Sequence, residues 1–264
     1  MSGLTKNHSW SFKNKNSMKN LLIILITLFS TSLFGQDVII TKRGDIKIHP
    51  IVHGTLAIEY EGITIYIDPY GGAEGFSGLN DADLILITDI HGDHLNKETL
   101  QALNTSKAHF IVPEAVAQQM EGIDHAEIEI LNNDKSTSFK GLDIKALPMY
   151  NLPESEDSRH PKGRGNGYLL HIDDKVIYIS GDTEDIPEMR ALQNIDIAFV
   201  CMNIPYTMTI DQAASAVLEF KPTIIYPFHF RGQGGLADVE KFKAMVNEEN
   251  ENIEVRLRNW YPKN

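Results

Sequence analysis

The sequence predicts an α/β protein with layered sheets, and two observations lead to this fold class. Short β-type runs bounded by turn residues dominate the first half of the chain, whereas strands alternate with helices in the last third. A length of 264 residues is enough for one large domain with a full core, and we find no short repeat, low-complexity segment or linker. We therefore expect one domain over residues 36–264.

The first 35 residues have the pattern of a secretory signal peptide. Lysines precede the apolar run 21–29, and small and polar residues follow it up to Gly35 and Gln36, near which we expect cleavage. Because the run is shorter than the roughly 20 residues that span a bilayer, we expect no stable membrane anchor. A signal peptide that starts at Met18 would be more typical, which would make residues 1–17 an over-called start. The protein is thus expected in the periplasm or outside the cell.

The charge balance and the cysteine content narrow the possible partners and sites. Without residues 1–35 the chain keeps 20 basic and 36 acidic residues, a net charge of −16. This negative charge argues against a nucleic-acid partner, so we expect the partner to be a small-molecule substrate. The charge does not decide the oligomeric state. Cys201 is the sole cysteine of the sequence, so a disulfide framework and a Cys-rich zinc cluster are excluded.

The first half of the chain alternates β-type runs with turn and cap signals. Glu61-Gly62 is a turn signal between two such runs, which predicts a hairpin. Asn96 is a candidate helix N-cap, and Pro113 has the favoured first position of a helix. These signals predict strands at 38–40, 46–48, 56–60, 63–67 and 84–87, a helix at 96–103, a strand at 109–112 and a helix from Pro113.

The second half begins with a β-rich stretch and an irregular polar loop at 151–167. Asp173-Asp174 is then a turn between two strands. The full prediction is strands near 128–130, 142–144, 168–172 and 176–180, a helix from about 185, a strand at 197–200, a helix at 210–220, a strand at 223–226, a helix at 236–246 and a strand at 253–257.

Four potential metal ligands follow the apolar run 84–87 within one short loop. These are Asp89, His91, Asp93 and His94, an arrangement that packing does not need. Carboxylate and imidazole side chains released together at a strand end are close enough to share one or two divalent cations.

Three later residues have the same setting, at the end of an apolar strand or in a loop beside it. Each also has an ordinary structural explanation: His160 as a solvated loop histidine, Asp182 as a helix N-cap, and His229 as a hydrogen-bonded core histidine. The four-ligand loop favours ligation for all three, because a metal held only by neighbours in one loop would be poorly enclosed.

The run Asp89-Ile90-His91-Gly92-Asp93-His94 resembles the H-x-H-x-D-H signature of the metallo-β-lactamase superfamily, with aspartate in place of the first histidine. The later ligands occur in the order and at the strand ends where that family places its own. A finer resemblance is to the branch of ascorbate-6-phosphate lactonase-like proteins. It rests on Met149-Tyr150-Asn151, His160-Pro161-Lys162-Gly163, Gly181-Asp182-Thr183 and Tyr206-Thr207-Met208.

This resemblance implies a four-layer αβ/βα sandwich with two divalent metal ions, zinc by default. Asp89, His91 and His160 would hold the first ion. The second ion would be held by Asp93, His94 and His229, with Asp182 bridging the two. Because Asp89 replaces a neutral imidazole by a harder, charged oxygen ligand, manganese or iron becomes possible at the first position.

The implied activity is that of an exported metal-dependent hydrolase of a small ester, lactone, amide or phosphodiester. A metal-bridged hydroxide would attack, Asp93 would orient it, and Tyr206 or Asn203 would stabilise the oxyanion. Two alternatives remain open, an iron-dependent redox enzyme on the same fold and a metal-binding protein without turnover.

Several further residues keep two interpretations. Cys201 is either a nucleophile or a buried strand-end residue, and His53 either lines the pocket or makes a structural hydrogen bond. Arg159, Lys162 and Arg164 either receive an anionic substrate or belong to a solvated loop.

Overall fold

The computed structural model describes residues 36–262. The predicted signal peptide and the alternative start at Met18 lie outside the described residues. Within residues 36–262, no helix is long and apolar enough to cross a membrane.

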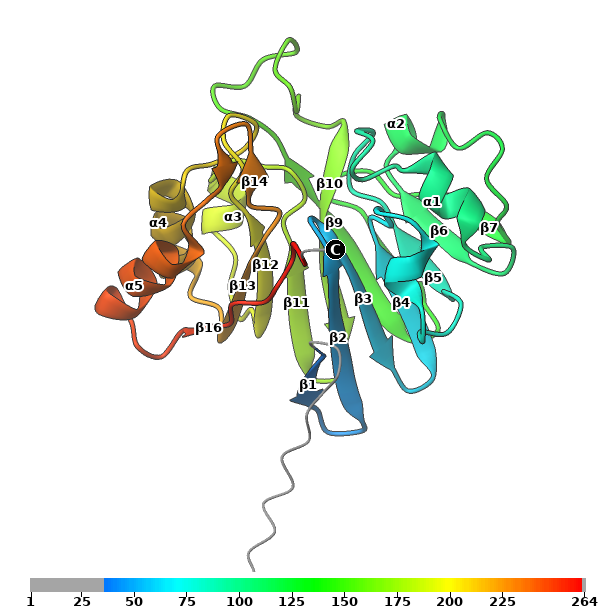
Figure 1. Ribbon diagram of the computed structural model, residues 1–264, viewed down its shortest axis with the longest axis horizontal. Helices are drawn as coiled ribbons and strands as arrows, with labels where there is room; N and C mark the ends of the chain where they lie inside the picture. The colour runs from blue at the N-terminus through cyan, green and yellow to red at the C-terminus, as the bar shows by residue number, and fades with distance from the viewer. Residues whose placement is uncertain (1–35, 263–264) are drawn as a thin grey trace, which may run out of the picture. The chain divides into compact units, whose positions relative to one another are not determined.

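Two seven-stranded sheets form the centre of the described fold (Figure 1). The predicted hairpin between β3 (Thr55–Tyr60) and β4 (Ile63–Ile67) is present, and its turn residues Glu61 and Gly62 both have positive φ, as a type I′ turn requires. The strands of the first sheet, in spatial order, are β1 (Asp37–Ile40), β2 (Asp45–Val52), β3 (Thr55–Tyr60), β4 (Ile63–Ile67), β5 (Leu84–Leu86), β6 (His109–Val112) and β7 (Glu127–Ile130).

The second sheet is antiparallel at one end and parallel at the other. Its strands, in spatial order, are β16 (Glu254–Val255), β13 (Ile224–Phe228), β12 (Ile197–Cys201), β11 (Lys175–Ile179), β10 (Gly165–Ile172), β9 (Leu142–Met149) and β8 (Ser136–Phe139). A separate hairpin of β14 (Arg231–Gly232) and β15 (Gly235–Leu236) follows β13 directly.

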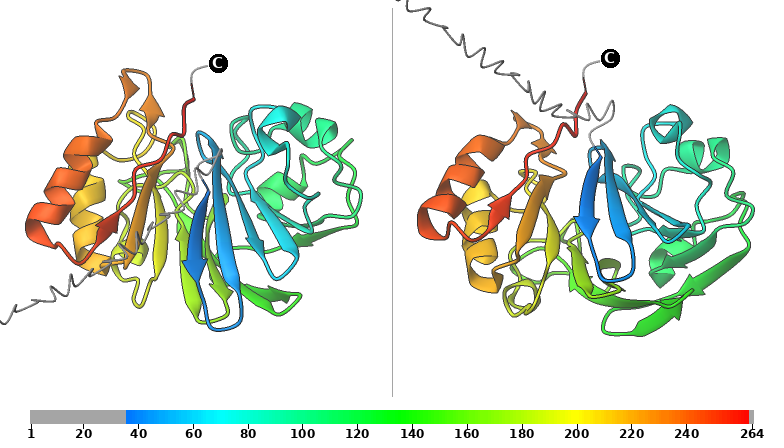
Figure 2. Two further views of the ribbon diagram at one scale, coloured as in Figure 1. Left: turned by 60° about the horizontal axis from the view of Figure 1, so that its bottom comes forward. Right: turned by 90° about the horizontal axis from the view of Figure 1, so that it is seen from below.

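Helices cover the outer face of each sheet (Figure 2). On the first sheet these are α1 (Lys97–Ala102) and α2 (Glu114–Ala117), with a short 3₁₀ helix, η1 (Ala73–Phe76). The second sheet carries α3 (Pro187–Arg190), α4 (Ile210–Phe220) and α5 (Val239–Glu249). Apolar side chains of both sheets, such as Ile48 and Tyr168, share one core between them. The predicted four-layer αβ/βα sandwich is therefore confirmed.

Some predicted boundaries were wrong for identifiable reasons. Strand β10 begins at Gly165, inside the predicted loop, because pairing with β9 and the buried hydrogen bonds of Asn166 override the weak strand propensity of Gly-Asn-Gly. Pro113 has an extended ψ of 156° and is the N-cap of α2 rather than its first residue. Helix α5 starts at Val239, because Leu236 pairs in β15 and the Asp238 side chain caps the helix.

Candidate metal centre

The seven predicted ligands come from four segments that end at the same edge of the two sheets. Asp89, His91, Asp93 and His94 lie in the loop after β5, and His160 lies in the loop between β9 and β10. Asp182 follows β11, and His229 follows β13 directly. The carboxyl ends of strands meet at one edge of a sheet, which is where α/β proteins collect their functional side chains.

One group of possible ligands consists of Asp89, His91 and His160, whose donor atoms lie within 4.8 Å of one another. His91 Nδ1 is 2.6 Å from Asp89 Oδ2, and His160 Nε2 is 4.0 Å from the same oxygen. Asp89 and His160 are fully buried. These are the three residues that the resemblance to the metallo-β-lactamase superfamily assigned to the first ion.

A second group consists of His94, Asp182 and His229. Asp182 Oδ2 lies 3.4 Å from His94 Nε2 and 3.3 Å from His160 Nε2, while its Oδ1 lies 3.4 Å from His229 Nε2. One carboxylate thus faces histidines of both groups, which is the position that a bridging ligand needs.

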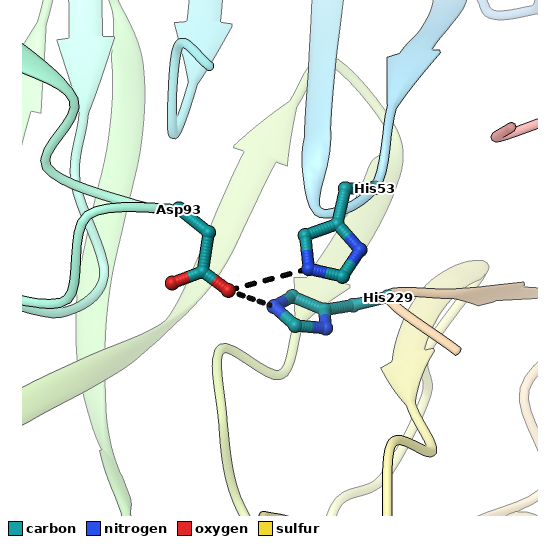
Figure 3. A group of neighbouring side chains, drawn as sticks. All are labelled: His53, Asp93 and His229. Carbon is teal, nitrogen blue, oxygen red and sulfur yellow. Dashed lines mark hydrogen bonds and ion pairs between the residues drawn. The ribbon is translucent and has the colours of Figure 1, made fainter. Parts of the chain in front are cut away.

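Asp93 is in a third group, with His53 and His229 (Figure 3). Its Oδ2 is 3.2 Å from His53 Nε2 and 3.4 Å from His229 Nε2. The Asp93 side chain is 32% exposed, against 5% or less for Asp89 and Asp182, so it lies at the opening of the site. Burial alone would raise the pKa of Asp93, but the neighbouring His229 and the hydrogen bond with His53 hold it well below its usual range.

His53 fits both of its interpretations. It lies in the turn between β2 and β3 with a φ of 59°, and its Nδ1 is 2.7 Å from the hydroxyl of Tyr261. Its backbone carbonyl accepts a hydrogen bond from the N–H of His229, which also has a left-handed φ, of 45°. Left-handed backbone at two adjoining non-glycine residues is costly and is typical of functional sites.

Buried donor atoms without a hydrogen bond converge at this edge. They include Nε2 of His94, His160 and His229, together with Asp182 Oδ1. Carboxylate oxygens lie 3.3–3.4 Å from these nitrogens, but without the geometry of a hydrogen bond. An unpaired buried polar atom costs roughly 1–3 kcal/mol, and lone pairs pointing at a common centre are what a divalent cation satisfies. The residues present therefore fit metal ions.

The second group has a carboxylate behind one of its histidines. His94 Nδ1 is 2.8 Å from Asp68 Oδ2 and 3.0 Å from Thr88 Oγ1, which directs Nε2 into the site. Burial would lower the pKa of His94, yet Asp182 and Asp68 hold it well above its usual value. Burial would raise the pKa of Asp182, but His229 and His94 hold it well below its usual range. Without a cation, these groups neutralise one another as ion pairs.

In the first group, the carboxylate of Asp89 is paired with a cationic side chain instead. Arg164 Nε donates to Asp89 Oδ1 at 3.1 Å, and its Nη2 donates to Asp89 Oδ2 at 3.0 Å. The negative charge that aspartate adds in place of histidine is therefore offset by one guanidinium. The sequence offered no signal for this pair, because the two residues are 75 positions apart.

The basic loop residues divide in a way that the sequence did not predict. Arg164 is bound to Asp89, and Lys162 pairs with Glu154 and Glu188, so both already have carboxylate partners within the chain. Arg159 lines a cavity of about 300 Å³ together with Asp93 and Asp182. The cavity is also lined by residues of the 203–206 loop and the 231–233 hairpin, namely Asn203, Tyr206, Arg231 and Gln233.

Cys201 is not a member of the candidate ligand groups of residues 36–262. Its thiol is fully buried and lies 3.4 Å from the carbonyl oxygen of Thr183. Burial raises the pKa of the Cys201 thiol to about 12. These features match the interpretation as a buried strand-end residue rather than a nucleophile.

Two facing sheets between helical layers, with histidines and carboxylates converging at one edge, define the metallo-β-lactamase class of fold. Residues 47–229 match the family described as the beta-lactamase superfamily domain. The chain therefore belongs to the β-lactamase superfamily.

The chain is also similar to proteins of several organisms. A UPF0173 metal-dependent hydrolase of Pyrococcus abyssi is 27% identical over 77% of this chain and 93% of its own length. A solved structure from Parabacteroides distasonis, assigned to the metal-dependent hydrolases, is 37% identical with a TM-score of 0.76, covering 86% of this chain and all of that one. The metallo hydrolase Igni18 of Ignicoccus hospitalis is 25% identical with a TM-score of 0.67, covering 81% and 94% of the two chains.

Proposed function

We propose that the protein is a metal-dependent hydrolase of a small ester, lactone, amide or phosphodiester. The observation that carries this proposal is the convergence of buried imidazole nitrogens and a carboxylate oxygen that have no hydrogen bond. The names of the relatives, which are metal-dependent hydrolases, support the same activity.

We assign the ligands as the sequence suggested. Asp89, His91 and His160 would hold one divalent ion, and Asp93, His94 and His229 would hold a second. Asp182, which faces both groups, would be a ligand shared between them. Bound divalent ions supply Lewis acidity and lower the pKa of water, which makes hydrolysis possible at neutral pH. Zinc suits this mixture of nitrogen and oxygen ligands.

Two side chains at the opening act on the substrate. Asp93 stays ionised beside His53 and His229, so its carboxylate would accept a hydrogen bond from the attacking water and orient it. Tyr206 lines the same cavity, and its hydroxyl accepts a hydrogen bond from Gln233 Nε2 at 3.1 Å. This leaves the Tyr206 proton free to stabilise a developing oxyanion.

Export is part of the proposal and rests on the pattern of residues 1–35. Mass spectrometry of the N-terminus of the protein recovered from periplasm and medium tests it. Cleavage near Gly35 is expected, and an intact N-terminus on cytoplasmic protein would contradict export.

The first test is metal analysis of the purified protein followed by a panel of esters, lactones, amides and phosphodiesters. We expect zinc and turnover of at least one substrate class. Iron with oxygen consumption would instead favour the redox alternative, and a metal-loaded protein inert to the whole panel would favour binding without turnover.

The second test is Asp182→Ala. Because Asp182 contacts both groups, we expect a loss of bound metal and a fall in activity greater than the roughly 10–100-fold that outer partners of ligands contribute. Asp211→Ala, an exposed acid on α4, is the matched control. Turnover in Asp182→Ala equal to that of the wild type would overturn the dinuclear site.

A further inference from the structure

The seven arginines of the sequence differ in whether they have a carboxylate partner. Five of them form ion pairs, namely Arg43, Arg164, Arg190, Arg256 and Arg258. In residues 36–262, Arg159 and Arg231 have no carboxylate within ion-pair distance, although acidic residues greatly outnumber basic ones. Unpaired arginines are thus the exception in this chain.

These two arginines line the same cavity of about 300 Å³, beside Asp93 and Asp182. They come from distant segments, one from the loop between β9 and β10 and the other from β14. Two segments separated by more than 70 residues therefore bring their free guanidinium groups to the opening of the candidate metal centre.

Aromatic rings hold both guanidinium groups in place. The Cζ atom of Arg159 is 4.6 Å from the ring centroid of Tyr206, and that of Arg231 is 4.3 Å from the ring centroid of Tyr261. Stacking uses the face of a guanidinium and leaves its N–H edge free to bind a carboxylate or a phosphate. The Tyr261 hydroxyl is itself fixed, because it accepts a hydrogen bond from the Arg231 backbone N–H and contacts His53.

The carboxylates of the candidate metal centre do not need the positive charges of Arg159 and Arg231 for neutralisation. Asp89 already has Arg164 as its cation, and two divalent ions would outweigh the charges of Asp93 and Asp182. Further positive charge at this opening would repel bound metal, and an anion between the two guanidinium groups would offset that repulsion.

We propose that the cavity binds a substrate carrying a negatively charged group, a carboxylate or a phosphate, between Arg159 and Arg231. The identification of this ligand as the substrate rests on the proposed hydrolase function. A larger adjoining cavity of about 670 Å³ shares His53 and Arg231 with the first and is lined partly by Ile51, Val52 and Tyr70. It offers space for the less polar remainder of the same molecule.

The direct test measures anion binding without turnover. Isothermal titration of the metal-loaded protein with inorganic phosphate and with succinate compares the wild type with Arg159→Gln, Arg231→Gln and the double variant. Each single variant is expected to weaken binding by about tenfold, because it removes one charged hydrogen-bond donor to the anion. Arg43→Gln, a paired arginine far from the cavity, should bind as the wild type does.

The comparison of phosphate with succinate distinguishes a phosphate site from a carboxylate site, because the site prefers the anion that binds more tightly. Equal affinities in the wild type and the double variant, with metal content unchanged, would overturn the proposal, because the anion would then bind to the metal alone. A thermal unfolding scan checks that each variant folds, and the conservative Arg231→Lys should recover part of the affinity.

A kinetic comparison connects the anion site with hydrolysis. 4-Nitrophenyl hemisuccinate and 4-nitrophenyl butyrate have the same leaving group and acyl length but differ in charge. We expect the double variant to raise KM for the hemisuccinate about tenfold or more and to leave the butyrate unaffected. If neither ester nor the wider panel is hydrolysed while phosphate binding still depends on the arginines, the hydrolase function fails and the anion site stands.

Discussion

The two ligand groups of the centre are supported by side chains of opposite charge. Behind the first group, Arg164 donates two hydrogen bonds to the Asp89 carboxylate. Behind the second group, the Asp68 carboxylate accepts from His94 Nδ1. A carboxylate behind a histidine raises its strength as a ligand, whereas a guanidinium behind a carboxylate draws charge away from the metal. We therefore expect the second position to bind its ion more tightly.

The largest effect on this comparison should come from removing one histidine of each group. His160→Ala should keep one tightly bound ion, whereas His229→Ala should lose the tight ion and retain only the weak one. Titration of the metal-free proteins with zinc measures both affinities. The reverse order of retained affinity would invert the comparison between the two positions.

Removal of the charge behind the second group should have a smaller effect. Asp68→Asn keeps the shape of the side chain, so we expect zinc affinity at this position to fall roughly 10–100-fold. Zinc titration against Asp45→Asn, an exposed control at the start of β2, measures the difference. An unchanged affinity would show that Asp68 only packs against His94.

The pair behind the first group can be tested by a double-mutant cycle. Arg164→Gln leaves the buried Asp89 without its partner, and Asp89→His leaves Arg164 beside an imidazole, so each should destabilise the metal-free protein. Both changes together restore a neutral pair of side chains, and a coupling free energy of about 1–3 kcal/mol is expected from urea unfolding. Purely additive effects would mean that Arg164 does not compensate for Asp89.

The smallest effect should come from Tyr206→Phe. Its hydroxyl is only half-buried, so we expect kcat to fall about tenfold or less, below the loss caused by removing a donor from an enclosed oxyanion site. Metal content measured on the same sample serves as the control. An unchanged kcat would remove Tyr206 from the mechanism.

The sequence alone predicted the fold class, most strands and helices, and the seven candidate ligands. These predictions were possible because the features are local: apolar runs have the period of their element, and the candidate ligands follow them or lie in a loop beside them. Boundaries failed where pairing decided them, as at Gly165, whose strand depends on β9.

The tertiary structure decided which charged groups face each other. Neither Arg164 behind Asp89, nor Asp68 behind His94, nor the stacked arginines at the opening can be read from spacing, because each partnership joins segments that are far apart in the chain. The loop 159–164 contains three basic residues that look alike in the sequence. Arg159 lines the cavity, Lys162 pairs with glutamates, and Arg164 offsets the charge of the candidate ligand Asp89. Electrostatic energy depends on distance in space, and only the folded chain sets that distance.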